Sequence, residues 1–249
     1  MKTTIKIIAL ALIWSFALMS FAQNSTKLTD DQIVTNRVAS KLAGHDRFHG
    51  VNVQVDDRIA RLSGNVELYI DKADAGRKAE KVDGVSGVRN EIIVNGKNVS
   101  DAELQETLAN KLRYDRLGYG IAFNNLAVKV TDGKATVSGQ VRDYSDRNSA
   151  IAIVETTLGV LDVEDEIAVA PVSVFDDQLR INLARAIYGH PSLQKYAMDP
   201  QAPIRIVVEN GRVQLYGATV NEMDKQVAYT QANSVPGVFG VTNHIVVAK

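Results

Sequence analysis

One eleven-residue pattern occurs three times in this chain, and its spacing constrains the fold more than any other feature. The copies cover residues 84–94, 159–169 and 237–247, and each begins Gly-Val-x-x-Val and ends Ile-x-Val. A second glycine lies 20 residues before each copy (84−64, 159−139 and 237−217). Identical spacing of this kind predicts three copies of one module of about 70 residues. The six marker glycines are Gly64, Gly84, Gly139, Gly159, Gly217 and Gly237.

Each copy is preceded by the same order of periodic segments. An apolar stripe at i, i+4 and i+8 predicts a first helix, and the stripe positions are Val34, Val38 and Leu42, then Leu104, Leu108 and Leu112, then Leu179, Leu183 and Ile187. An aspartate lies three residues before each stripe. Its charge suits the positive end of the helix dipole, so we interpret it as a helix cap. These aspartates are Asp31, Asp101 and Asp176.

Alternating apolar residues around a tight turn predict a hairpin after the first helix. Asp132-Gly133 and Asn210-Gly211 are strong signals for a two-residue turn. The first module has Asp56-Asp57-Arg58 and no turn glycine, which leaves its turn geometry open. A second helix follows, with Asp71, Ser145 and Asn221 as the expected caps.

This pattern predicts an α+β fold of three tandem α-β-β-α-β modules, over residues 29–97, 100–171 and 174–249. A right-handed crossover places the third strand parallel to the second. Only one face of each strand is consistently apolar, so we expect a three-stranded mixed sheet with both helices on one face.

The first 22 residues are typical of a signal peptide. Lys2 and Lys6 form the positive end, residues 7–19 are apolar, and Ser20-Phe21-Ala22 ends on a small residue before the expected cleavage point. The apolar run is about 13 residues and a membrane span needs about 20. We therefore expect a periplasmic protein without a lipid anchor or a transmembrane helix in the mature chain.

Composition excludes several classes of function. The chain has no cysteine, which excludes a lipoprotein anchor, disulfides and thiol chemistry. Without Lys2 and Lys6, 26 basic residues (28−2) face 29 acidic ones. A nucleic-acid partner is not expected, because such proteins usually carry a basic excess.

The helix stripe, the hairpin ending in glycine and the Gly-Val-x-x-Val-x-Asn-x-Ile-x-Val closure resemble the BON domain, which is named after bacterial osmotically inducible and nodulation proteins. The resemblance covers residues 29–249. Modules one and three carry the closure asparagine (Asn90 and Asn243), whereas module two has Asp165. The resemblance implies an envelope protein without catalysis, associated with osmotic and envelope stress and with phospholipid or membrane contact. A chaperone-like or scaffold role towards other envelope proteins is the alternative.

No constellation of residues predicts catalysis, a cofactor or a metal. His45 and His49 are four apart, but they fall in an expected loop without a third ligand. Asn90, Asp165 and Asn243 are expected to bond nearby backbone. The sequence therefore predicts neither an enzyme nor a cofactor site.

Two features predict a lipid- or partner-binding surface. The loop from the first helix to the first strand varies most between modules and holds aromatic residues, including Tyr119 and Tyr196; these aromatics could equally fold back and cover the end of the module. The turn into the third strand has Ser86, Leu161 or Phe239 at its variable position. Leu161 and Phe239 would either contact a membrane or partner or pack between modules. The oligomeric state, the lipid and the client proteins do not follow from the sequence.

Overall fold

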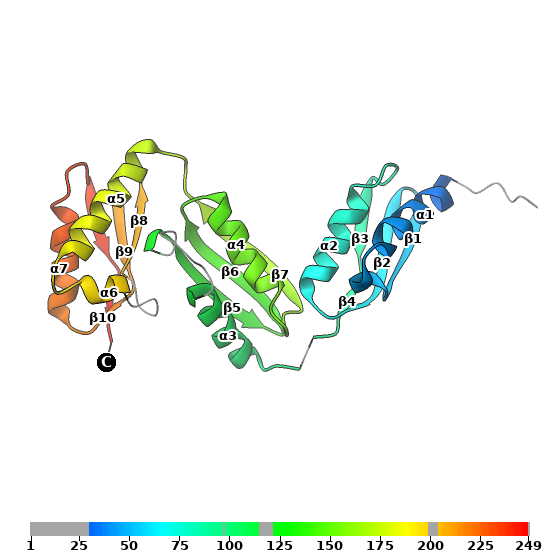
Figure 1. Ribbon diagram of the computed structural model, residues 1–249, viewed down its shortest axis with the longest axis horizontal. Helices are drawn as coiled ribbons and strands as arrows, with labels where there is room; N and C mark the ends of the chain where they lie inside the picture. The colour runs from blue at the N-terminus through cyan, green and yellow to red at the C-terminus, as the bar shows by residue number, and fades with distance from the viewer. Residues whose placement is uncertain (1–29, 97, 115–121, 199–203, 249) are drawn as a thin grey trace, which may run out of the picture.

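The computed structural model describes residues 30–96, 98–114, 122–198 and 204–248, and Figure 1 shows three α/β units along the chain. The expected signal peptide, residues 1–22, lies outside these residues. Module one contains α1 (Asp30–Ala43), η1 (Asp46–Phe48), β1 (Val51–Asp56), β2 (Ile59–Val66), α2 (Tyr69–Glu80), β3 (Gly87–Asn90) and β4 (Ile93–Val94). Module two contains α3 (Asp101–Tyr114), β5 (Asn125–Thr131), β6 (Lys134–Val141), α4 (Tyr144–Glu155) and β7 (Asp162–Val169). Module three contains α5 (Val174–Gly189), α6 (Gln194–Met198), β8 (Arg205–Glu209), β9 (Arg212–Tyr216), β10 (Ala218–Thr219), α7 (Glu222–Asn233), β11 (Gly240–Asn243) and β12 (Val246–Val247).

The predicted α+β fold is confirmed in all three modules. In module two, β5 pairs antiparallel with β6, and β7 pairs parallel with β6. Modules one and three repeat this order, except that their third strand is divided at the closure asparagine into β3 and β4 and into β11 and β12. In module three the second strand is also divided, into β9 and β10. The helices cover one face of each sheet (Figure 1). The predicted stripe residues of the first helices are all buried in three hydrophobic cores, one for each module.

The predicted capping role of the repeated aspartate is wrong, because Asp31, Asp101 and Asp176 lie inside the first turns of their helices and Ser173 caps α5. Both carboxylate oxygens of Asp176 accept hydrogen bonds from the turn amides of Asn210 and Gly211, each at 2.9 Å. Asp101 bonds the turn of module two at 2.7 and 2.9 Å, and Asp31 that of module one at 3.2 and 3.3 Å. The aspartate therefore joins the start of the first helix to the hairpin turn in every module, an arrangement that we call the turn clamp.

The clamp resolves the turn of module one, whose geometry the sequence left open. Asp57 and Arg58 both have positive φ, at 47° and 63°, although neither is glycine. Such a conformation is costly for residues other than glycine and persists only where its surroundings hold it. The backbone amides of both residues donate hydrogen bonds to the Asp31 carboxylate, and these two bonds hold the turn in place.

The expected caps of the second helices are correct in one module of three. Asn221 caps α7 by accepting a bond from the Asp224 amide at 2.7 Å. The cap of α4 is Asp143 rather than Ser145, and α2 starts after Leu68, whose side chain makes no cap bond. The caps of α2 and α4 lie three and two residues earlier than predicted. Asp71 therefore lies inside α2, where it pairs with Arg47 at 3.2 Å.

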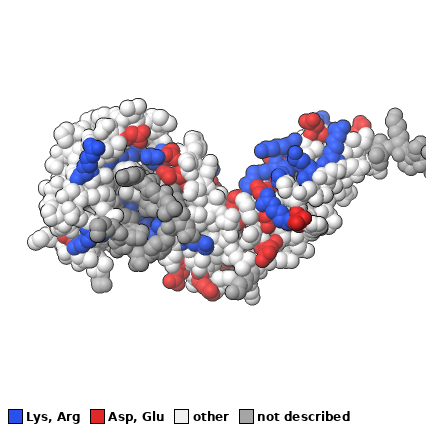
Figure 2. Space-filling model, viewed as in Figure 1, with Lys and Arg blue, Asp and Glu red and all other residues white. Residues whose placement is uncertain are grey.

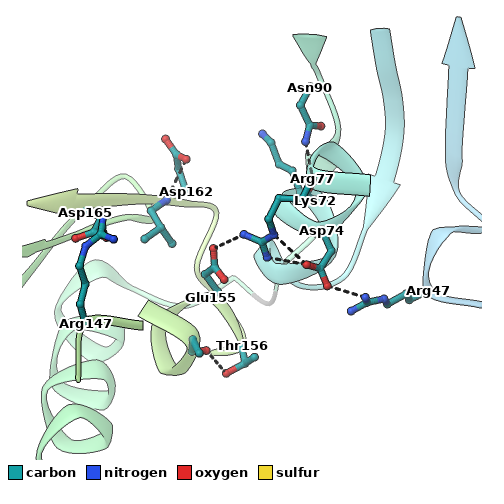
Figure 3. Close-up of polar contacts among 12 residues, drawn as sticks. Arg47, Lys72, Asp74, Arg77, Asn90, Arg147, Glu155, Thr156, Asp162 and Asp165 are labelled. Carbon is teal, nitrogen blue, oxygen red and sulfur yellow. Dashed lines mark hydrogen bonds and ion pairs between the residues drawn. The ribbon is translucent and has the colours of Figure 1, made fainter. Parts of the chain in front are cut away.

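The closure asparagines bond backbone, as predicted. Asn90 donates to the Lys72 carbonyl at 2.7 Å, and Asn243 donates to the Lys225 carbonyl at 3.2 Å, so each ties the third strand to the second helix. In module two Asp165 also bonds backbone, since it accepts from the Ile167 amide at 3.0 Å, and its carboxylate forms an ion pair with the Arg147 side chain at 2.8 Å (Figure 3).

Polar groups join modules one and two (Figure 3). Arg77 of α2 pairs with Glu155 of α4 at 3.4 Å and with Asp74 at 2.7 Å. Tyr69 packs against the core of module two. Burial raises the pKa of its hydroxyl, and the carboxylates of Asp162 and Glu155 raise it further.

Modules two and three share apolar contacts as well as polar ones. Phe123, just before β5, is buried in the hydrophobic core of module three, and Ala122 packs against the same core. Gln140 of β6 donates to Glu209 of β8 at 3.4 Å. The junction is therefore partly a continuation of the core of module three.

The loop aromatics of module three cover the end of the module. The Tyr196 hydroxyl donates to Asp224 at 2.7 Å and accepts a bond from the Val220 amide at 2.9 Å. Lys195 pairs with the same carboxylate at 2.7 Å. Burial alone would raise the pKa of Asp224, but the hydrogen bonds from Lys195 and Tyr196 outweigh it and lower that pKa.

The turn clamp predicts a graded loss of stability. Asp176→Asn replaces one acceptor with an NH₂ group facing a backbone N–H, so we expect it to cost about 1.5–3 kcal/mol, as for a buried charge-assisted bond. Asp31→Asn should cost less, because its bonds are longer and more exposed. Calorimetry of the mature chain would measure both melting temperatures. Equal losses at the two positions would contradict this account of the clamp.

The Asp224 cluster predicts an acid-dependent stability. A carboxyl group whose pKa is lower in the folded state stabilises that state above its unfolded pKa, about 4, and loses this contribution as the pH falls further. The difference in melting temperature between the wild type and Asp224→Asn should therefore be largest near pH 7 and should shrink below about pH 4. A difference that stays constant from pH 7 to pH 3 would show that the carboxylate charge is unimportant.

Candidate functional site

The four residues predicted to bind lipid or a partner fall into different environments. Tyr196 is only 4% exposed and bonded as described above, so it serves as a lid and offers no binding surface. Tyr119 lies outside the residues that the structure describes. Leu161 and Phe239 are 41% and 73% exposed.

The variable position of the closing turn lies beside the hairpin turn in every module. The backbone amide of this residue donates to a hairpin-turn carbonyl: Ser86 to Arg58 at 2.8 Å, Leu161 to Gly133 at 2.9 Å, and Phe239 to Gly211 at 2.9 Å. The same end of each module therefore presents a different side chain on a common backbone.

Leu161 is held by two nearby segments of the same polypeptide. Its side-chain carbons lie so close to Gly133 that a Cβ there would meet them at 2.7 Å, and a Cβ on the linker residue Gly96 would meet them at 3.3 Å. Leu161 thus packs on its own hairpin turn and on the chain arriving from module one. Part of its side chain is therefore covered, and the rest stays exposed.

Phe239 is exposed because only part of its ring is covered. One face stacks on Phe175 in the first turn of α5, with ring centroids 6.1 Å apart and planes 21° from parallel. Phe175 is itself 50% exposed, and the neighbouring Val172 and Val174 are almost fully exposed. We call these four residues, Val172, Val174, Phe175 and Phe239, the apex patch.

Sequence reasoning missed three members of the apex patch. Phe175 stands next to the clamp aspartate Asp176, at a position where modules one and two have Asp30 and Ser100. Module three alone has an aromatic residue at that position and also a phenylalanine in the closing turn. This coincidence could have indicated an exposed aromatic surface. To interpret that signal, one would need to know that the start of α5 and the closing turn meet at the hairpin turn.

Few charges surround the apex patch in the described part of module three. Asp177 is exposed but pairs with Arg180 at 2.7 Å, and Arg212 follows the turn at the start of β9. Lysine and arginine side chains gather instead on module one in the view of Figure 2. The patch is therefore suited to apolar contact more than to recognition of an anionic surface.

The described residues contain one group of three carboxylates that could approach a metal, Asp31, Asp56 and Asp57. Both oxygens of Asp31 already accept amide bonds of the turn clamp, which accounts for its position. His45 packs edge-on against Phe48, and the Nδ1 of His49 lies 2.5 Å from the Asp46 carbonyl. These groups are explained by local structure.

Among the described residues, no helix has the length and apolar character needed to cross a membrane.

Comparison with known proteins places these modules in a family. Osmotically-inducible protein Y of Escherichia coli (strain K12) is 25% identical over 147 residues, which cover 55% of this chain and 72% of that protein. The C-terminal domain of CdsD, titled the structural protein of the Type III secretion system of Chlamydia trachomatis, is 14% identical, with 86% of this chain and 96% of that chain covered and a TM-score of 0.25. The periplasmic domain of the T3SS inner membrane protein PrgH from S. typhimurium is 10% identical, with coverages of 85% and 97% and a TM-score of 0.20.

A family model of the BON domain matches residues 30–96, 100–171 and 176–249. These matches take in all three modules and most of the chain. The chain belongs to the BON domain family and carries three copies of the domain in tandem.

Proposed function

We propose that this protein acts in the periplasm as a non-enzymatic envelope protein that contacts phospholipid membrane surfaces through the apex patch under osmotic stress. The osmotic context is supported by the similarity to Osmotically-inducible protein Y. The membrane contact is supported mainly by the stacked, exposed pair of Phe175 and Phe239.

The shape of the patch favours a lipid layer over a protein groove as its partner. Phe239 lies in a turn and Phe175 in the first turn of a helix, so both belong to the end of the module and not to a sheet face. Aromatic and aliphatic groups at such an end can enter the boundary between headgroups and acyl chains. Few basic side chains accompany them, so binding should depend little on anionic lipid.

The expected energy of this contact is modest. Full burial of one phenylalanine side chain is worth roughly 1.5–3 kcal/mol, which corresponds to about one to two decades in affinity. Phe239 already shares one face with Phe175, so these figures are upper limits for its contribution.

Phe239→Ser should weaken binding to phosphatidylcholine vesicles by up to about ten- to hundredfold, as measured by co-sedimentation. The melting temperature should change little, because the side chain is largely exposed. Met223→Ser is the matched control: Met223 is 75% exposed but lies at the opposite end of α7, and its replacement should leave binding unchanged.

Two outcomes would contradict the proposal. A Phe239→Ser protein that melts at a lower temperature and still binds vesicles would show that the ring is a structural contact. A wild-type protein that binds no vesicle, but suppresses aggregation of unfolded client proteins, would favour the chaperone-like or scaffold role.

A further inference from the structure

Modules two and three differ in how they fill the space between the first helix and the edge strand. Counted from the clamp aspartate, Gln105 corresponds to Arg180 (101+4 and 176+4), and Arg113 corresponds to Tyr188 (101+12 and 176+12). In module three the Arg180 side chain is buried and donates to the Val208 carbonyl at 2.6 Å. The partly buried Tyr188 hydroxyl donates to the Ile204 carbonyl. These two side chains occupy the space between α5 and β8.

The same space in module two is a cavity of about 350 Å³. Gln105 is shorter than arginine and uses its carbonyl oxygen to accept the Val130 amide bond at 3.0 Å. Small and aliphatic side chains form one part of the wall between α3 and β5, and polar side chains form the rest. The apolar part consists of Ala102, Ala109, Leu112, Leu126, Ala127 and Val128. A cavity of this size lies within the range of small-molecule sites.

Two buried hydrogen-bond donors on this wall have no acceptor among the residues that the structure describes. Asn124 is 3% exposed; its Oδ1 accepts the Arg142 amide bond at 2.8 Å, but its Nδ2 has no partner within the described chain. The buried Nε of Arg113 likewise has no partner among the described residues. Unmade bonds of this kind are unfavourable, so a ligand that supplies an acceptor here would bind with a gain in free energy.

The charged side chains of the cavity wall indicate which charge the acceptor group of a ligand should carry. Arg113 and, from module three, Arg205 are cationic, whereas Glu106 is anionic. The balance is one positive charge (2−1), which suits a monoanion better than a dianion such as a phosphate monoester. The aliphatic part of the wall favours an anion that also carries an apolar body.

We propose that the cavity between α3 and β5 binds a small monocarboxylate with an aliphatic body, of which octanoate is a simple example. Its carboxylate accepts from Arg113 and Asn124, and its chain contacts Leu112, Leu126 and Val128. This site is separate from the apex patch and does not depend on the membrane proposal.

Isothermal titration of the mature wild-type protein with octanoate should show saturable binding below millimolar concentrations. Acetate has the charge without the body, octanol has the body without the charge, and octyl phosphate carries added negative charge. Acetate and octanol should each bind at least about tenfold more weakly, since each loses one of the two kinds of contact. Octyl phosphate should also bind more weakly, because its added negative charge exceeds the single net positive charge of the wall.

Two variants locate the site. Arg113→Met keeps an aliphatic wall but removes the donor and the charge, and should weaken octanoate binding about tenfold or more with an unchanged melting temperature. The double variant Gln105→Arg, Arg113→Tyr copies the filled space of module three and should abolish binding. Circular dichroism would verify that both variants are folded.

Phe239→Ser is the matched control for the apex patch and should bind octanoate as the wild type does. Absence of octanoate binding to the wild type at millimolar concentration would overturn the proposal. Equal affinity in the folded double variant would also overturn it, because the ligand would then occupy another part of the molecule.

Discussion

A carboxylate that accepts two backbone amides of a hairpin turn is the interaction on which each module of this protein depends. The turn is bound from two sides: the clamp aspartate holds its amides, and the amide of the closing turn donates to one of its carbonyls. The first helix, the hairpin and the start of the third strand therefore meet at the hairpin turn. Because charge-assisted bonds are directional and stronger than neutral ones, this point defines the relative position of the three elements.

The repeat itself made most of the fold predictable from the sequence. Gly64 and Gly139 show why glycine recurs at this position: a Cβ there would come within 1.9 Å of the Gly50 carbonyl oxygen, just before β1, or within 2.1 Å of the Asn125 carbonyl oxygen in β5. The role of the clamp aspartates could not be predicted in the same way. Their helix position already had a sufficient local explanation, whereas their partners lie 26 to 35 residues away.

The candidate site was predictable only in part, for a related reason. Phe239 was found because the same position could be compared across three copies. Tyr196 was also selected for its aromatic character, but only the fold shows that its hydroxyl meets the buried Asp224 carboxylate. Phe175 became a site residue through its stacking on Phe239, a contact between segments more than 60 residues apart (239−175). Exposure and packing are tertiary properties, and composition cannot separate them.

The burial of Phe123 bears on how the chain folds. This residue precedes α5 by about fifty positions (174−123), yet it belongs to the core of module three. The core of module three is thus completed by a segment that is synthesised before module two's own sheet. Opening of module two would expose apolar surface in its neighbour, so the two should behave as one cooperative unit. Module one is joined by ion pairs and a tyrosine, so it can open with less effect on the other two modules. The sequence therefore contains three repeats, whereas we expect two cooperative folding units.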